Sequence, residues 1–230
     1  MKETLETRKG NKMNKTMYCT LDNETFGGAA CPKGSYHLGG IIHDNTGHVY
    51  GCFNYIIMEN YNEIKTDKYA KKNFERYNQM LNSGNATIID TEDHAVEMVE
   101  AILKYYNVKY VMAYNSAFDF NKTKCYKLIE NREFIDIWLM ALETVISKKS
   151  YSTFCHKNNL KNQTGRSVST TAQTVYAFLT NSPDYVEEHT ALEDSKIEME
   201  IFLACIRCHK KYTKNIHCMN AQVYYLFPRW

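Results

Sequence analysis

The chain lacks the features that mark membrane, secreted and repetitive proteins. No stretch approaches the roughly 20 consecutive apolar residues that a membrane-spanning helix needs, so a membrane protein is excluded. Residues 1–16 contain no charged region followed by an apolar segment, so we expect no secretory signal. Neither an internal repeat nor a low-complexity block is evident. These absences predict a soluble, cytoplasmic protein without a membrane partner.

The cysteines are too irregularly spaced to form a disulfide framework. Eight of them are spread over 230 residues, without the dense, even spacing of a small secreted scaffold, which favours a reducing compartment. Cys205, Cys208 and His209, followed by His217 and Cys218, offer enough ligands for a tetrahedral zinc ion. No clear second Cys-x-x-Cys follows, and Cys205 lies on the expected buried face of a helix. We therefore do not predict a zinc site.

A strong net charge is also missing. The formal charge is +2, too small to bind nucleic acid through a global field, so such contacts should come from local patches and metal ions. Only three prolines occur, while Asn, Lys, Tyr and Ile are abundant, which hints at an A/T-rich genome such as that of a phage or a low-GC bacterium. The 230 residues, 44% of them hydrophobic, suffice for one α/β domain.

Apolar runs and turn signals predict a mixed sheet flanked by helices. The first three strands should form an antiparallel meander, with a tight turn at residues 45–47 (Asn-Thr-Gly) between the second and the third. Apolar residues that recur every three or four positions predict amphipathic helices. The expected strands are residues 17–21, 38–43, 49–57, 110–114 and 134–138. The expected helices lie around residues 69–81 and 96–106, from residue 116, and at residues 171–179 and 190–208.

The polar, aperiodic residues 1–16 are predicted to be a flexible extension, and residues 17–208 a single domain. Residues 209–230 form a basic, aromatic tail that we do not treat as a separate domain. Its lysines and aromatic residues are typical of single-strand binders, although a docked C-terminal segment would look the same. The Ser/Thr-rich run around Arg166 suits either the approach of a phosphate backbone or a solvated loop.

Asp22 and Glu24 follow the first apolar run. Because side chains alternate across a strand, the two would project to the same face, about 6.6 Å apart at roughly 3.3 Å per residue. Two carboxylates at that separation suit a shared cation. Taken alone, an Asp-x-Glu triplet at a strand end is more often a solvated turn, so the metal interpretation needs support from elsewhere in the chain.

Two further acids stand at expected helix starts. Asp119 follows a strand candidate, although Ser116 and Asp119 also resemble a helix-capping pair. Thr190 and Glu193 match a capping box, which explains a helix start but leaves Asp194 unaccounted for. The residues three, seven and eleven positions after Asp194 are apolar, so its carboxylate should face the core. An unpaired buried charge costs several kcal/mol, and a cation would offset that cost.

Three motifs in this order resemble those of the DEDDh branch of the DEDD superfamily, the DnaQ-like 3′–5′ exonucleases, whose members share a ribonuclease H-like fold. They are DNET at residues 22–25, YNSAFD at residues 114–119 and HTALED at residues 189–194, in which His precedes the last Asp by five positions. The resemblance covers residues 17–208. Within this family, the sequence resembles the proofreading epsilon subunit of bacterial replicative polymerases and phage-encoded exonucleases. Many relatives have Thr in place of Phe26 and His in place of Tyr114.

This resemblance implies that Asp22, Glu24, Asp119 and Asp194 hold two Mg²⁺ or Mn²⁺ ions and that His189 takes a proton from the attacking water. Two cations about 3.5–4 Å apart can serve both sides of a phosphodiester without a covalent intermediate. A histidine with a reference pKa near 6.5 is mostly neutral at pH 7 and able to accept a proton, which suits a general base.

The residues that flank the motifs match the regions that hold the terminal nucleotide in the family. The substrate contacts implied are Thr25, Phe26, Asn115 and Phe118. Aromatic stacking would tolerate any base because every base has a π-face. Asp136, on another strand candidate, lies outside the metal-binding quartet, and we expect it to cap or pair locally.

The predicted function is a 3′–5′ exonuclease that removes nucleotides from single-stranded DNA. The motifs do not separate DNA from RNA, because the 2′-hydroxyl is read by pocket geometry, so an exoribonuclease that trims short RNA is the alternative. An alternative from a different functional class is a binding or polymerase-associated subunit that keeps the fold and metals but is non-catalytic or depends on a partner. A homodimer is a further candidate assembly.

Overall fold

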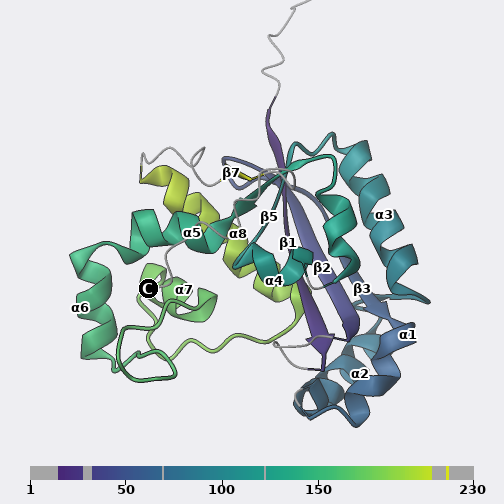
Figure 1. Ribbon diagram of the computed structural model, residues 1–230, viewed down its shortest axis with the longest axis horizontal. Coiled ribbons are helices and arrows are strands. Elements are labelled where there is room, and N and C mark those ends of the chain that lie inside the picture. Colours follow the sequence, from purple (N-terminus) through teal and green to yellow (C-terminus); the bar gives the residue numbers. More distant parts are fainter. Residues whose placement is uncertain (1–14, 28–32, 69, 122, 209–215, 218–230) are drawn as a thin grey trace, which may run out of the picture.

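The centre of the fold is a mixed sheet (Figure 1). The computed structural model describes residues 15–27, 33–68, 70–121, 123–208 and 216–217, and the statements below concern this part of the chain. Nearly all of the predicted extension and tail lie outside it. The sheet has the strand order β4-β3-β2-β1-β5-β6-β7. Its strands are β1 (Met17–Phe26), β2 (Gly34–Asp44), β3 (Val49–Ile57), β4 (Thr87–Ile89), β5 (Tyr110–Ala113), β6 (Glu133–Asp136) and β7 (Ile216–His217).

The predicted meander is confirmed. β1 pairs antiparallel with β2, and β2 pairs antiparallel with β3. The turn between β2 and β3 is held by Asp44, whose carboxylate accepts hydrogen bonds from the N–H groups of Thr46 and His48 at 2.8 and 3.2 Å, and Gly47 supplies a φ of 90°. β5 runs parallel to β1, and β6 runs parallel to β5. The carboxyl ends of these three strands therefore meet at one edge of the sheet.

The strand bounds differ from the prediction in physically clear ways. β1 continues through Asp22 and Glu24 instead of ending at residue 21, and β2 begins at Gly34 and is buried along its whole length. β6 ends at Asp136, so the prediction that residues 137 and 138 belong to a strand is wrong. The Asp136 carboxylate accepts a hydrogen bond from the N–H of Leu139 at 3.2 Å and thereby caps the next helix. β4 was not predicted.

Helices cover both faces of the sheet (Figure 1). α3 and α4 share a buried cluster with one face of β1, β2 and β5, while α5 to α8 share a second cluster with the other face. The predicted helices are present, and α1, α5 and α6 were missed. The helices are α1 (Met58–Tyr61), α2 (Phe74–Ser83), α3 (Glu92–Tyr105), α4 (Ser116–Asn121), α5 (Ile137–Ala141), α6 (Lys149–Lys157), α7 (Ala172–Leu179) and α8 (Ala191–Arg207).

Residues 58–83, here called the α2 lobe, connect β3 to β4 and pack against the carboxyl end of β1. Phe26 and Tyr36 from the sheet join Tyr61, Ile64 and Tyr77 from the lobe in a third buried cluster. The backbone N–H of Gly27, just after β1, donates to the Asp67 carboxylate at 2.9 Å. The lobe is therefore fixed at the edge of the sheet to which the acidic end of β1 points.

None of the described helices has the length and apolar character needed to cross a membrane. The six cysteines in the described part of the chain are free, and Cys205 is buried in α8, as expected. His209 and Cys218, which the zinc alternative requires, lie outside the described residues. Lys15, at the end of the predicted extension, contacts the fold through a salt bridge with Asp44 at 3.0 Å.

Candidate functional site

β1 presents its acidic residues toward α8. Tyr18 belongs to the cluster on the α8 face and Cys19 to the opposite cluster, so alternation along the strand assigns both Asp22 and Glu24 to the α8 face. The prediction had placed them on one shared face without naming it. Asn23, on the other face, donates from Nδ2 to Oδ1 of Asp119 at 2.9 Å. This hydrogen bond links the first acidic segment directly to the second.

Asp119 lies in α4, just beyond the carboxyl end of β5, and only 2% of it is exposed. Burial raises the pKa of its carboxyl well above the usual value, and the hydrogen bond from Asn23 opposes that rise. The N–H and Oγ of Ser116 both donate to Asp136, at 3.1 and 3.0 Å. Asp136 thus anchors the start of α4 and caps α5, which confirms the expectation that it acts locally.

The segment before α8 is held without the predicted capping box. Thr190 is the N-cap residue, but its side chain accepts no capping hydrogen bond, so that part of the prediction is wrong. Instead, Nδ1 of His37 on β2 accepts a hydrogen bond from the N–H of Ala191 at 3.1 Å, and the Tyr77 hydroxyl donates to the His189 carbonyl at 3.0 Å. His189 itself has a φ of 54°, a conformation that needs such support.

A glycine allows α8 to approach the sheet closely. A Cβ on Gly39 of β2 would lie 2.3 Å from the backbone N of Leu192, so no larger residue fits at this position. Ser195 adds a hydrogen bond from its Oγ to the Gly39 carbonyl at 3.1 Å. The first turn of α8, which carries Asp194, is therefore fixed against the middle of the sheet.

The Asp194 carboxylate faces inward, as its helical position predicted. Its Oδ1 is buried and has no hydrogen-bond partner among the described residues. Burial, together with the negative charges of Glu187 and Glu24, raises its pKa to about 8. A buried acceptor without a hydrogen-bond partner is rare in folded proteins, which makes the Asp194 carboxylate a candidate metal ligand.

The structure brings three of the five predicted catalytic residues within ligand distance of one another, and electrostatic interactions link the other two, Asp22 and Asp119, to them. Glu24, His189 and Asp194 each offer a potential metal-ligand atom, and these atoms lie within 4.8 Å of one another. Burial and the charges of Asp119, Glu198, Asp194 and Glu24 raise the pKa of Asp22 well above its usual value, which places Asp22 in the same electrostatic cluster. Burial also raises the pKa of Glu24 to about 7.

Two further carboxylates of this cluster were missed from the sequence. Glu198 is 4% exposed, and its Oε2 accepts a hydrogen bond from the N–H of Tyr114, at the end of β5, at 3.1 Å. Burial, then the charge of Asp119, raises its pKa well above the usual value. Glu187 has its pKa raised to about 7 by burial and by Glu24. Glu198 lies one helical turn after Asp194, on the same side of the helix, and this spacing could have identified it from the sequence.

The four predicted substrate-contact residues differ in how exposed they are. Thr25 is half-buried at an irregularity in the β1–β2 pairing, and Phe118 is half-buried in α4. The Phe26 ring is buried in the cluster that holds the α2 lobe. Asn115 is exposed, with a φ of 63°, and lines a cavity of about 360 Å³ together with Tyr114, Trp138, Thr170, Thr171 and Ala172.

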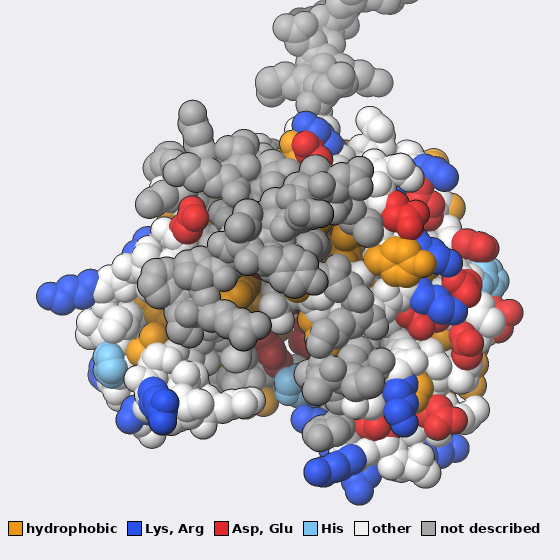
Figure 2. All heavy atoms as spheres, in the orientation of Figure 1, with side chains coloured by type: hydrophobic (Ala, Val, Ile, Leu, Met, Phe, Trp, Pro, Cys, Tyr) orange, Lys and Arg blue, Asp and Glu red, His pale blue; other side chains and the backbone are white. Residues whose placement is uncertain are grey.

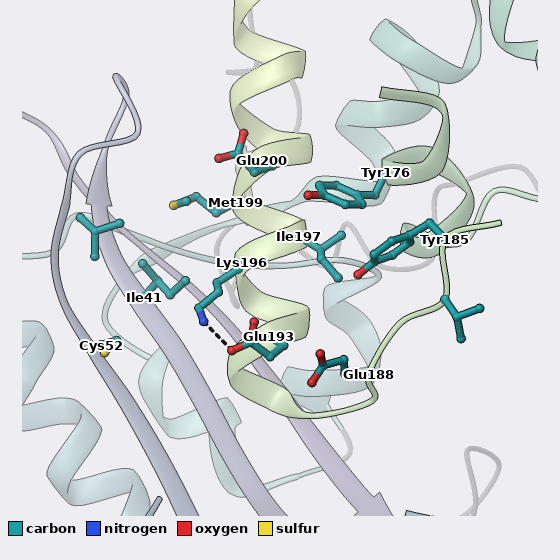
Figure 3. A pocket seen from close by; sticks show the side chains of 12 residues that line it. Ile41, Cys52, Tyr176, Tyr185, Glu188, Glu193, Lys196, Ile197, Met199 and Glu200 are labelled. Atoms are coloured by element: carbon teal, nitrogen blue, oxygen red, sulfur yellow. Dashed lines mark hydrogen bonds and ion pairs between the residues drawn. The ribbon is translucent and has the colours of Figure 1, made fainter. Parts of the chain in front are cut away.

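A larger cavity lies beside α8 (Figure 3). Its volume is about 590 Å³, and it lies between α8, the segment around Tyr185 and the sheet. None of the five predicted catalytic residues lines it, and its most prominent polar feature is the ion pair between Lys196 and Glu193. The acidic cluster therefore remains the candidate functional site.

We compared the chain with protein families, curated proteins and solved structures. No family model and no curated protein matches it. Among solved structures, it is similar to the crystal structure of cell-death related nuclease 4 (CRN-4), with 12% sequence identity and a TM-score of 0.51. The match covers 84% of this chain and 64% of that one, so the chain spans less than two thirds of that neighbour's length. This likeness concerns the fold: the chain has a ribonuclease H-like α/β fold, in which helices flank a mixed sheet.

Proposed function

We propose that the chain is a metal-dependent 3′–5′ exonuclease that hydrolyses the terminal phosphodiester of single-stranded DNA. The observation that carries this proposal is that potential ligand atoms of Glu24, His189 and Asp194 lie within 4.8 Å of one another, while Asp22 and Asp119 interact electrostatically with the same carboxylates. The fold that positions them is shared with a protein named as a nuclease. A cluster of buried carboxylates is hard to explain without a cation, because the charges repel each other.

The donor set fits Mg²⁺ or Mn²⁺. These hard cations prefer carboxylate oxygen, and Asp194 offers a buried Oδ1 that lacks any partner in the described structure. Asp22, Glu24, Asp119 and Asp194 would hold two such ions. When bound, the ions would supply Lewis-acid stabilisation of charge on the scissile phosphate and lower the pKa of water.

His189 would act as the general base. Burial, with the positive charges of Lys72 and Arg76, lowers its pKa, so the imidazole is neutral at pH 7. Water would add its oxygen to phosphorus while His189 accepts the proton, and the bond from phosphorus to the 3′ oxygen would break. The products would be a 5′-mononucleotide and a strand shortened by one residue, whose new 3′ oxygen takes a proton from solvent.

The cavity beside Asn115 would receive a nucleotide of the strand. The Trp138 and Tyr114 rings in its wall offer apolar surface for a base, and their hydrogen bonds to Thr170 hold them in place, at 3.3 Å from Trp138 Nε1 and 2.6 Å from the Tyr114 hydroxyl. Thr25, Asn115 and Phe118 remain the proposed contacts to the terminal nucleotide. Such contacts carry little base specificity.

The test uses 5′-labelled single-stranded DNA and RNA of one sequence, with Mg²⁺, Mn²⁺ or chelator. We expect wild-type protein to give a descending ladder that requires metal and is faster on DNA. Asp22→Ala should abolish the ladder, while Glu97→Gln, which changes an exposed carboxylate of α3, should leave it unchanged. Intact DNA with degraded RNA would establish the exoribonuclease alternative. Cleavage that Asp22→Ala retains would contradict the proposed mechanism, and intact substrate in every lane would leave the partner-dependent subunit.

A further inference from the structure

Two positively charged side chains of the α2 lobe, Lys72 and Arg76, lie beside the acidic cluster. They were not singled out from the sequence. Lys72 lies in the short 3₁₀ helix Ala70–Asn73, and Arg76 lies four residues later in the first turn of α2. Both side chains are exposed, and no salt bridge in the described part of the chain includes either. Lys65, in the same lobe, instead lies over the Phe74 ring at 5.2 Å.

The position of these cations is fixed by the contacts of the lobe. Tyr77, the residue after Arg76, is fully buried, and its hydroxyl donates to the His189 carbonyl at 3.0 Å. Its ring meets the Tyr36 ring edge-on, with centroids 5.2 Å apart. The backbone that carries Arg76 is therefore attached directly to the segment that carries His189.

Both positively charged side chains interact electrostatically with the acidic cluster. Lys72 is the foremost group that opposes the burial-driven rise in the pKa of Glu24, and Arg76 lowers the pKa of Asp194. Figure 2 shows Lys and Arg side chains, interspersed with Asp and Glu, over the α2 lobe, beside a hollow where Asp, Glu and His side chains are visible. Lys72 and Arg76 thus place positive charge beside the negatively charged carboxylate cluster.

A nucleic-acid strand that approaches the acidic cluster needs positively charged side chains nearby. Its phosphates are repelled by a cluster of carboxylates, and a formal charge of +2 supplies no general attraction. Lysine and arginine side chains contact phosphate oxygens without reading bases, and such contacts set the register of the strand. Arginine can bind two phosphate oxygens at once, while lysine acts as a point charge.

We propose that Lys72 and Arg76 form a binding site for a backbone phosphodiester of the nucleic-acid strand, separate from the phosphodiester that is cleaved. The two residues are positioning residues: they hold the strand so that its 3′ end reaches Glu24, His189 and Asp194. The ligand class is a single-stranded polynucleotide, and the contact is independent of base sequence. This inference rests on the proposed function for its substrate.

The first measurement is binding of a fluorescein-labelled thymidine 12-mer at several salt concentrations, in chelator, so that no cleavage occurs. For single strands, the slope of log affinity against log salt changes by about 0.7 for each phosphate that the protein no longer neutralises. The Lys72→Gln/Arg76→Gln double variant, which loses the one phosphate that both side chains contact, should therefore lower the slope by about 0.7. Lys71→Gln, an exposed neighbour in the same lobe, is the matched control and should keep the wild-type slope. Lys72→Arg should also keep it.

The second measurement locates the contact. A set of 12-mers, each with one neutral methylphosphonate linkage, should contain a position at which wild-type affinity falls to that of the double variant, while the double variant is insensitive there. With Mn²⁺ and unmodified DNA, each single variant should raise KM about tenfold, the effect expected from removing one charge-assisted hydrogen bond, with kcat little changed.

The outcomes separate the two proposals. An unchanged salt slope in a folded double variant, or equal sensitivity of both proteins to every neutral linkage, would overturn the phosphate site even if the wild type cleaves DNA. A reduced slope without metal-dependent cleavage by the wild type would keep the phosphate site and reject the nuclease. Folding is checked by circular dichroism, and because both side chains are exposed we expect native spectra.

Discussion

At the residue scale, the most informative atom is Oδ1 of Asp194. The sequence placed this carboxylate on the apolar stripe of a helix, and the structure leaves the atom buried without a partner among the described residues. Asp194 and His189 could be connected from their five-residue spacing. Glu198 and Glu187 could not be assigned in the same way, because their proximity to the cluster depends on how α8 and the preceding segment pack against β1 and β5.

His189→Ala separates a general base from a metal ligand. If His189 accepts a proton, kcat should fall by about 10²- to 10⁴-fold while Mn²⁺ affinity stays near the wild-type value. The affinity is measured by Mn²⁺ titration and the rate under saturating metal. His156→Ala, which changes an exposed histidine of α6, is the control. A large loss of Mn²⁺ affinity would instead make His189 a ligand, a role that its distance of less than 4.8 Å from Glu24 and Asp194 permits.

At the scale of elements, the beginning of α8 is the part of the fold on which the site depends most. Its position is set by His37 on β2, by Tyr77 on α2 and by the missing side chain of Gly39. These supports come from segments more than 100 residues away in sequence, as between Tyr77 and His189, which are 112 residues apart. No local sequence pattern around residue 189 indicates these contacts.

Tyr77→Phe tests whether this support matters for activity. The change keeps the buried ring but removes the hydrogen bond to the His189 carbonyl, so the free energy of unfolding should fall by about 1 kcal/mol. We expect a loss of kcat larger than this small destabilisation explains, because His189 loses its fixed position. Tyr61→Phe removes a comparable hydroxyl contact, to Asn78 in the same lobe, and is the matched control. Equal kcat for the two variants would show that the Tyr77 contact is only structural.

The sequence was informative about elements with a regular pattern. The meander, the β5 strand and α8 follow from alternation, turn residues and helical spacing, and the structure confirms them. β2 begins at Gly34 and not at residue 38, because Gly34, Ser35 and His37 interrupt the apolar pattern although the structure buries all three. β4 is three residues long and α6 has few apolar positions, so neither produces a clear periodic signal.

At the scale of the whole molecule, the acidic cluster makes stability depend on pH and on divalent ions. Burial raises the pKa of Asp194 to about 8 and of Glu24 and Glu187 to about 7, from ordinary values near 4. Carboxyls with raised pKa values favour the folded state fully below pH 4, and this contribution is lost as the pH rises through 7 and 8. Bound cations would offset the loss, because they stabilise the charged form.

We therefore expect the Tm in chelator to fall between pH 5 and pH 9, and Mn²⁺ to raise it more at pH 8 than at pH 5. Asp194→Asn should reduce both effects, whereas Glu97→Gln should leave both intact. The measurement is differential scanning fluorimetry at matched ionic strength. A Tm in chelator that rises steadily with pH, or a Mn²⁺ effect that is the same at both pH values, would contradict this account.

The order of the segments along the chain has a consequence for synthesis. Asn23 and Asp119, joined by a hydrogen bond, are 96 residues apart, and Asp194 enters the cluster only when α8 docks on β1 and β2. The meander consists of neighbouring segments and can form early, whereas the cluster requires long-range contacts that form slowly. A nascent chain on the ribosome would therefore carry a folded meander but no assembled acidic cluster until the residues of α8 have emerged.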